Sequence, residues 1–298
     1  MNDQAQRLRE LAGDHHLPAS VASSSTGRTA GLQTGLPASI AVTSGKGGVG
    51  KTNCALFLAT AFAAHKKRVL LLDADFGLAN VHILLGIAPR RTLAQVVEGE
   101  CSLDEVVTTT PGGFDIVPGA SGLEKMATLD RGRLELLQRE FRRLENRYDL
   151  LLVDTGAGIG TAVTQFASGT DITLIVMTPE PTSLADAYAM VKVLSGRTNR
   201  PIGVIVNMAA SDREGSEIFD RLNALVVKFL RRSIEHYCTL PHYREVGRYV
   251  RKQRLLLLEK NNTVFAQRIY QLAARIAGVD HPVRKGFFDR LVQGMISL

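Results

Sequence analysis

The sequence has few cysteines and no long apolar run. Its three cysteines, Cys54, Cys101 and Cys238, lie far apart and form no Cys-x-x-Cys pair. Such usage indicates a reducing compartment and gives no cysteine-bound metal or cluster site. No stretch contains the roughly 18 apolar residues that a membrane-spanning helix needs, and the polar start of the chain is unlike a secretory signal. We therefore expect a cytoplasmic protein that spans no membrane.

Apolar sequence is nevertheless sufficient for a large core. Of the 298 residues, 45% are hydrophobic, so the chain can form one domain with appendages. Lysine and arginine number 36 against 29 aspartates and glutamates, which gives a net charge of +7. This excess is compatible with acidic lipid or nucleic acid as a partner and proves neither.

Strand-like apolar runs alternate with helical segments from residue 39 to residue 277. The alternation predicts an α/β fold with a mainly parallel, doubly wound sheet flanked by helices on both faces. Ligands of such folds bind outside the carboxyl ends of the strands. We expect strands at 39–43, 68–73, 114–117, 149–153, 171–177 and 202–206, and helices near 53–65, 130–147, 182–195, 215–231 and 262–277.

The two ends of the chain differ in character from this domain. Residues 1–12 have the pattern of one short helix, which would become ordered only against a partner. Residues 13–38 are rich in Ser, Thr, Gly and Pro, which predicts a flexible linker. Residues 278–298 are expected to form a linker and an amphipathic helix. Its apolar stripe is Phe287, Phe288, Leu291, Val292, Met295 and Ile296, with Lys285, Asp289, Arg290 and Gln293 away from it.

A complete phosphate-binding loop follows the first expected strand. The pattern Gly-x-x-x-x-Gly-Lys-Thr ends at Lys51 and Thr52. Its glycines let backbone N–H groups converge on phosphate oxygens, while Lys51 supplies a positive charge and the Thr52 hydroxyl suits Mg²⁺. The helix that comes next would place its N-terminus at the phosphates. The predicted nucleotide-binding residues here are Gly45, Lys46, Gly47, Gly48, Val49, Gly50, Lys51, Thr52 and Asn53.

Polar residues close three further strands. One strand ends in Asp73, with Asp75 two residues on, and another ends in Asp154. Beside a phosphate loop, such carboxylates can reach Mg²⁺ or orient an attacking water, although each could instead cap a helix or stand in an exposed loop. Asn207 follows the last expected strand, and its carboxamide suits the edge of adenine. An ordinary strand-ending asparagine is equally consistent with that position.

Together these residues resemble the MinD/ParA-type deviant Walker A ATPases of the SIMIBI class. The resemblance covers residues 39–277 and implies that the chain binds ATP and ADP with Mg²⁺ and hydrolyses ATP slowly. It also implies an ATP-dependent homodimer, in which the extra lysine, Lys46, reaches the other subunit's nucleotide. The implied catalytic residues are Lys46, Lys51 and Asp75, of which Asp75 positions water. The implied Mg²⁺ ligands are Thr52 and, through water, Asp73 and Asp154. The implied contacts to the base are Asn207 and Pro241.

Within that family the sequence is most similar to FlhG-type regulators of flagellar number and placement. The sequence DQAQRLR at residues 3–9 matches their DQAxxLR motif, which implies that residues 1–12 stimulate an FlhF-like GTPase. Residues 285–292 resemble a MinD-type membrane-targeting helix, so residues 285–298 are expected to bind the inner membrane surface. Flagellar switch or transcription regulators are further implied partners. The implied location is that of a peripheral protein at the cytoplasmic face of the inner membrane, including the membrane at the cell pole.

The strength of the C-terminal stripe can be approximated. Six large apolar side chains contribute roughly 9–18 kcal/mol if fully buried, and ordering about fourteen residues costs roughly 1 kcal/mol or more each. The balance is near zero, so one tail would bind a membrane weakly, and two tails on a dimer would gain from effective concentration. The stripe could instead pack on the protein's own surface, with ATP releasing it.

Three other functions are compatible with parts of the sequence. A ParA-like DNA-segregation ATPase would use basic residues such as Arg231, Arg232, Arg244, Arg248, Arg251, Lys252 and Arg254. Charge at that density is also typical of a solvated helical face, so direct DNA binding is not expected. A MinD-like division-site ATPase is a second alternative. A non-catalytic adaptor is a third, and the presence of Asp75 and Lys46 argues against it.

Overall fold

The computed structural model describes residues 34–35, 39–75, 80–119, 131–278, 281–282 and 286–296. Eight strands in these ranges form one sheet, in the order β4-β5-β3-β6-β2-β7-β8-β9. Neighbouring strands are parallel except β4 and β5. The strands are β2 (Ser39–Ser44), β3 (Val69–Ala74), β4 (Thr108–Thr109), β5 (Asp115–Val117), β6 (Leu150–Ala157), β7 (Ile172–Met177), β8 (Ile202–Ala209) and β9 (Glu235–Pro241). The predicted α/β fold class is confirmed.

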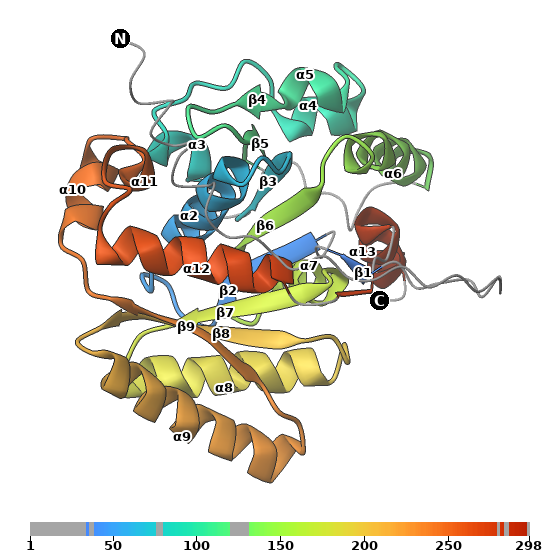
Figure 1. Cartoon of the computed structure of the whole chain (residues 1–298). Helices are drawn as coiled ribbons and strands as arrows, with labels where there is room; N and C mark the ends of the chain where they lie inside the picture. Colours follow the sequence, from blue (N-terminus) through green and yellow to red (C-terminus); the bar gives the residue numbers. More distant parts are fainter. Residues whose placement is uncertain are drawn as a thin grey trace, which may run out of the picture. The chain divides into compact units, whose positions relative to one another are not determined.

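Helices cover both faces of this sheet (Figure 1). On one face, α2 and α12 bury Phe57 and Phe265 against the sheet. The other face is covered by α6, α13, α7, α8 and α9. The longer helices are α2 (Lys51–Ala64), α6 (Arg131–Glu145), α7 (Thr161–Gly169), α8 (Pro181–Ser195), α9 (Asp212–Leu230), α12 (Val264–Gly278) and α13 (Phe287–Ile296). The shorter ones are α3 (Val81–Leu84), α4 (Leu93–Glu98), α5 (Leu103–Val106), α10 (Glu245–Arg251) and α11 (Leu256–Glu259).

The centre of the sheet explains why its strands are continuous apolar runs. β2 lies between β6 and β7, with Val42 paired to both Asp154 and Leu174. Because helices cover both faces, all six residues of β2 are buried. The parallel arrangement brings the carboxyl ends of β2, β3 and β6 to one edge. The phosphate loop and the strand-ending aspartates therefore meet there.

Several elements were not predicted. β9 has a mixed burial pattern rather than an apolar run, and α7 is only nine residues long. Residues 34–35, within the predicted linker, form the short strand β1 (Thr34–Gly35), which pairs antiparallel with β10 (His281–Pro282). Residues 1–12, with the DQAxxLR motif, lie outside the described residues.

The C-terminal helix α13 packs on the domain itself. Phe287, Phe288, Leu291 and Val292 are buried, in the same cluster as Phe141 of α6. The Phe288 ring stacks on that of Phe141, with 3.6 Å between their centroids. This is the surface-packed alternative for the stripe. No membrane-spanning helix occurs among the described residues.

Candidate nucleotide-binding site

The phosphate loop connects β2 to α2, and its backbone requires glycine at several positions. Gly48 and Gly50 have left-handed backbones, with φ of 81° and 86°, which other residues rarely adopt. A Cβ at Gly45 would lie 2.3 Å from the carbonyl oxygen of Asp186. No side chain can therefore occupy that position without displacing α8. The loop leads directly into the N-terminus of α2, a geometry suited to phosphate.

Lys51 and Thr52 converge on Asp154 at the end of β6. Lys51 Nζ lies 2.9 Å from Asp154 Oδ1, and the two side chains are only 8% and 1% exposed. The Thr52 side chain is hydrogen bonded to the same carboxylate. Burial raises the pKa of Asp154, and the neighbouring Lys51 opposes that effect. A buried carboxylate with a hydroxyl and an ammonium group beside it suits a phosphate and Mg²⁺.

Asp73 has a role that its sequence position did not reveal. Its Oδ1 accepts the backbone N–H of Asp75 at 3.2 Å, and its Oδ2 accepts that of Val81 at 3.1 Å. The carboxylate therefore ties the end of β3 to the start of α3. Burial, with a contribution from nearby Asp154, raises the pKa of Asp73 to about 7. Asp73 also pairs in register with Asp154, the other aspartate among the predicted Mg²⁺ ligands.

Asp75, the residue after β3, lies next to the end of β6. A Cβ at Gly156, near the end of β6, would be 3.4 Å from Asp75 Oδ1. Gly158, just after β6, has a left-handed backbone with φ of 90°. Since β3 and β6 are paired as far as Ala74 and Thr155, Asp75 and Gly156 lie side by side at the carboxyl edge of the sheet.

The Lys46 side chain is hydrogen bonded to residues at the start of α8. Its Nζ lies 2.7 Å from Glu180 Oε2 and donates to Thr182 Oγ1 at 3.2 Å. The Lys46 and Glu180 side chains are 39% and 60% exposed, so this ion pair is weak. Glu180 and Thr182 were missed because only the fold brings the start of α8 beside the loop.

A cavity of about 390 Å³ lies beside the loop, lined by Gly50, Asn53, Asn207 and Pro241 among others. This volume is in the range of small-molecule sites. Asn207 Nδ2 donates to the carbonyl oxygen of Val49 at 2.8 Å. Since a carbonyl can only accept, this bond fixes the orientation of the amide and leaves its Oδ1 as an acceptor. The structure thus brings all the predicted nucleotide contacts to one edge of the sheet.

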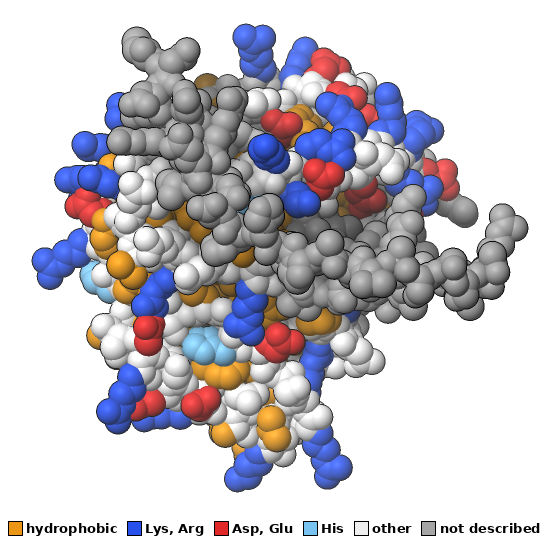
Figure 2. Space-filling model, viewed as in Figure 1, with side chains coloured by type: hydrophobic (Ala, Val, Ile, Leu, Met, Phe, Trp, Pro, Cys, Tyr) orange, Lys and Arg blue, Asp and Glu red, His pale blue; other side chains and the backbone are white. Residues whose placement is uncertain are grey.

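The basic residues between Arg231 and Arg254 do not form one uncommitted patch. Arg232 donates to the carbonyl oxygen of Thr198, while Arg248 and Arg254 pair with Glu245 and Glu259. Figure 2 shows Lys and Arg side chains spread over the visible face with acidic side chains among them.

The fold and the site define a P-loop nucleotide-binding protein. The sequence pattern of the CobQ/CobB/MinD/ParA nucleotide binding domain matches residues 40–240. The chain belongs to this family and is a MinD/ParA-type ATPase.

Two relatives place the chain more finely. It is 45% identical over 220 residues to antiactivator FleN of Pseudomonas aeruginosa, covering 72% of this chain and 77% of that protein. It is 31% identical over 263 residues to the flagellum site-determining protein YlxH of Helicobacter pylori, covering 85% and 89%. Among solved structures, MinD from Aquifex aeolicus superposes with a TM-score of 0.64 and 27% identity, covering 83% of this chain and 99% of that one.

Proposed function

We propose that this chain is an ATP-dependent dimerising switch that regulates flagellar number and placement. The observation that carries the proposal is the second lysine of the phosphate loop. Lys46 is held by an exposed pair with Glu180, so it is available to a second subunit. Similarity to FleN and YlxH supports the flagellar role.

The nucleotide contacts follow from the site. Lys51 would leave Asp154 for the outer phosphates, and the glycine backbone would hold their oxygens. Mg²⁺, when bound, would offset phosphate charge; Thr52 is the residue to hold it, with Asp73 and Asp154 acting through water. Asp75 would orient the attacking water. The Oδ1 of Asn207 would accept a hydrogen bond from the amino group of adenine. Guanine has a carbonyl group at that position of its ring, which cannot donate one.

Dimerisation would use the edge that carries this site. Ile159, just after β6, is 49% exposed, and Met208, within β8, is 40% exposed. Such large apolar side chains at one edge suit a contact formed only in one nucleotide state. Lys46 would then exchange Glu180 for the partner's ATP.

The outputs of the switch lie at the chain ends. Release of α13 would let residues 285–298 bind the cytoplasmic face of the inner membrane, more tightly in a dimer with two such helices. Residues 1–12 would stimulate an FlhF-like GTPase. Flagellar switch or transcription regulators would be further partners. The chain would lie at the cell pole where these partners do.

Sedimentation velocity with ATP, ADP or no nucleotide tests the proposal. The wild type should dimerise with ATP alone. Lys46→Gln should bind ATP and stay monomeric, whereas Lys51→Ala should lose ATP binding as well. Lys67→Gln, at an exposed lysine beyond the end of α2, is the matched control and should behave as wild type. ATP-driven dimers of Lys46→Gln would contradict the proposed role of Lys46.

A further inference from the structure

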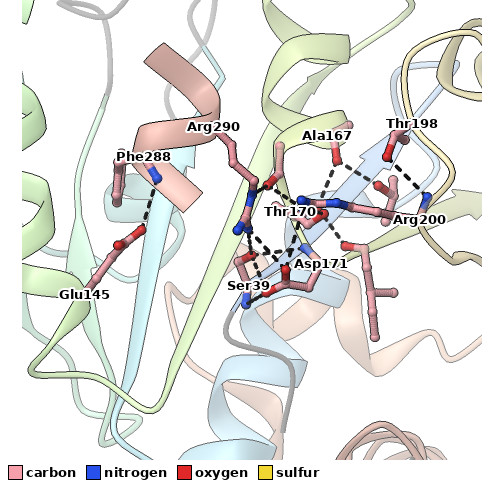
Figure 3. A network of polar contacts seen from close by, with 12 residues as sticks. Ser39, Glu145, Ala167, Thr170, Asp171, Thr198, Arg200, Phe288 and Arg290 are labelled. Atoms are coloured by element: carbon pink, nitrogen blue, oxygen red, sulfur yellow. Dashed lines mark hydrogen bonds and ion pairs between the residues drawn. The ribbon is translucent and has the colours of Figure 1, made fainter. Parts of the chain in front are cut away.

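Helix α13 carries a charged side chain into its docking site. Arg290 Nη2 lies 3.2 Å from Asp171 Oδ1, at the start of β7, and the two side chains are 20% and 7% exposed. Arg290 Nε donates to the carbonyl oxygen of Gly169 at 2.9 Å, and its Nη2 lies 3.4 Å from Ser39 Oγ. Figure 3 shows this arginine reaching from α13 into the cluster. The sequence had placed Arg290 away from the buried stripe.

Each of these three acceptors has a second partner within the domain. Arg200 Nη1 also donates to the Gly169 carbonyl, at 2.9 Å, and lies 3.6 Å from Asp171 Oδ1. Asp171 Oδ2 accepts the backbone N–H and the hydroxyl of Ser39 at 3.1 and 3.0 Å. Ser39 Oγ in turn accepts the backbone N–H of Asp171 at 3.1 Å. Departure of Arg290 therefore leaves none of the three acceptors without a partner.

A helix that belonged permanently to the core would not need this duplication. Removing the only cation from a buried carboxylate is strongly unfavourable, because the charge is left uncompensated. With Arg200 in place, Asp171 stays paired whether α13 is docked or not. The two guanidinium groups also share one carboxylate and one carbonyl, so their repulsion weakens the hold on Arg290.

We propose that Arg200 is a resident counter-ion that makes α13 detachable, keeping Asp171 paired when Arg290 leaves. Arg200 is a positioning residue that sets how readily the helix is released. The biological meaning rests on the proposed membrane role of α13, but the release equilibrium is a property of the free chain. Its test therefore needs neither lipid nor nucleotide.

Loss of Arg200 should tighten the docking of α13 rather than loosen it. Without Arg200, undocking would leave Asp171 with no cation beside it, so the docked state would be favoured more strongly. A merely structural Arg200 would give the opposite result, since its loss would loosen the surface on which α13 rests. In an Asp171→Asn background there is no charge to compensate. Loss of Arg200 should then no longer tighten docking.

Hydrogen exchange of the full chain, followed by mass spectrometry at one pH, measures this equilibrium directly. Amides of 287–296 report on α13, and those of 264–278 in α12 serve as the internal reference. We expect exchange in α13 to be at least tenfold faster in Arg290→Met and in Asp171→Asn, and several-fold slower in Arg200→Met. Arg142→Met, in α6, removes a solvent-accessible ion pair with Asp289 of α13. This variant should change the exchange of α13 by less than twofold.

Faster or unchanged exchange of α13 in Arg200→Met would overturn the proposal, as would an α13 that is unprotected in the wild type. If α12 also exchanges faster in that variant, the domain has been disturbed, and Arg200→Gln replaces it. Glutamine can still donate to the carbonyl oxygens but carries no charge, so α13 must again exchange more slowly. A wild type that fails to bind lipid would remove the membrane role and leave these exchange rates unaffected.

Discussion

Replacing Phe288 by alanine should release α13 rather than destabilise the domain in proportion to the lost packing. The four buried side chains Phe287, Phe288, Leu291 and Val292 contribute roughly 6–12 kcal/mol to docking. Ordering the ten residues of α13 costs about 10 kcal/mol at roughly 1 kcal/mol each. Docking is therefore balanced to within a few kcal/mol. Loss of a buried Phe costs about 3–5 kcal/mol, which exceeds that margin.

Urea unfolding of the nucleotide-free protein, combined with hydrogen exchange, checks this reasoning. In Phe288→Ala, α13 should lose its protection, while the free energy of unfolding of the domain falls by no more than the docking margin. Phe265→Ala, in the α12 cluster, should cost the full amount of about 3–5 kcal/mol. A Phe288→Ala protein that loses as much stability as Phe265→Ala, with α13 still protected, would refute the marginal docking.

Three further predictions concern the nucleotide site. Because the pKa of Asp73 is raised to about 7, the folded chain binds a proton that the unfolded chain releases above about pH 4. Stability should therefore fall as pH rises from about 4 to 7, and Asp73→Asn should flatten this dependence in urea unfolding. Gly45→Ala should lower the free energy of unfolding by about 1–3 kcal/mol and abolish ATP binding. A Cβ added at Gly47 has nothing within 4 Å, so Gly47→Ala should be as stable as the wild type. Asn207→Leu should weaken ATP binding at least tenfold in calorimetry, with Lys67→Gln, outside the site, as the control.

The sequence was sufficient for the parts of the site that local patterns encode. The phosphate loop needs particular residue types at fixed spacing, and buried parallel strands are continuous apolar runs. The start of β2, the loop and Asp154 could therefore be placed before the structure. β9 could not, because its residues alternate irregularly between buried and exposed.

Contacts between distant residues were beyond such patterns. Glu180 pairs with Lys46 only because the fold brings the start of α8 to the loop. Arg290 follows Asp171 by 119 residues, and on a helical projection it belongs to the polar face. Tertiary pairing with a buried carboxylate decided its position. The second partner of that carboxylate, Arg200, has no local signal at all.

Co-sedimentation with anionic liposomes tests the central claim most directly, because it couples the nucleotide state to the membrane output. The full-length chain and a chain ending at residue 280 would be compared with ATP, ADP or no nucleotide. The switch predicts that only the full-length chain pellets, and only with ATP. Equal pelleting in all three nucleotide states, or pelleting that survives the truncation, would contradict it.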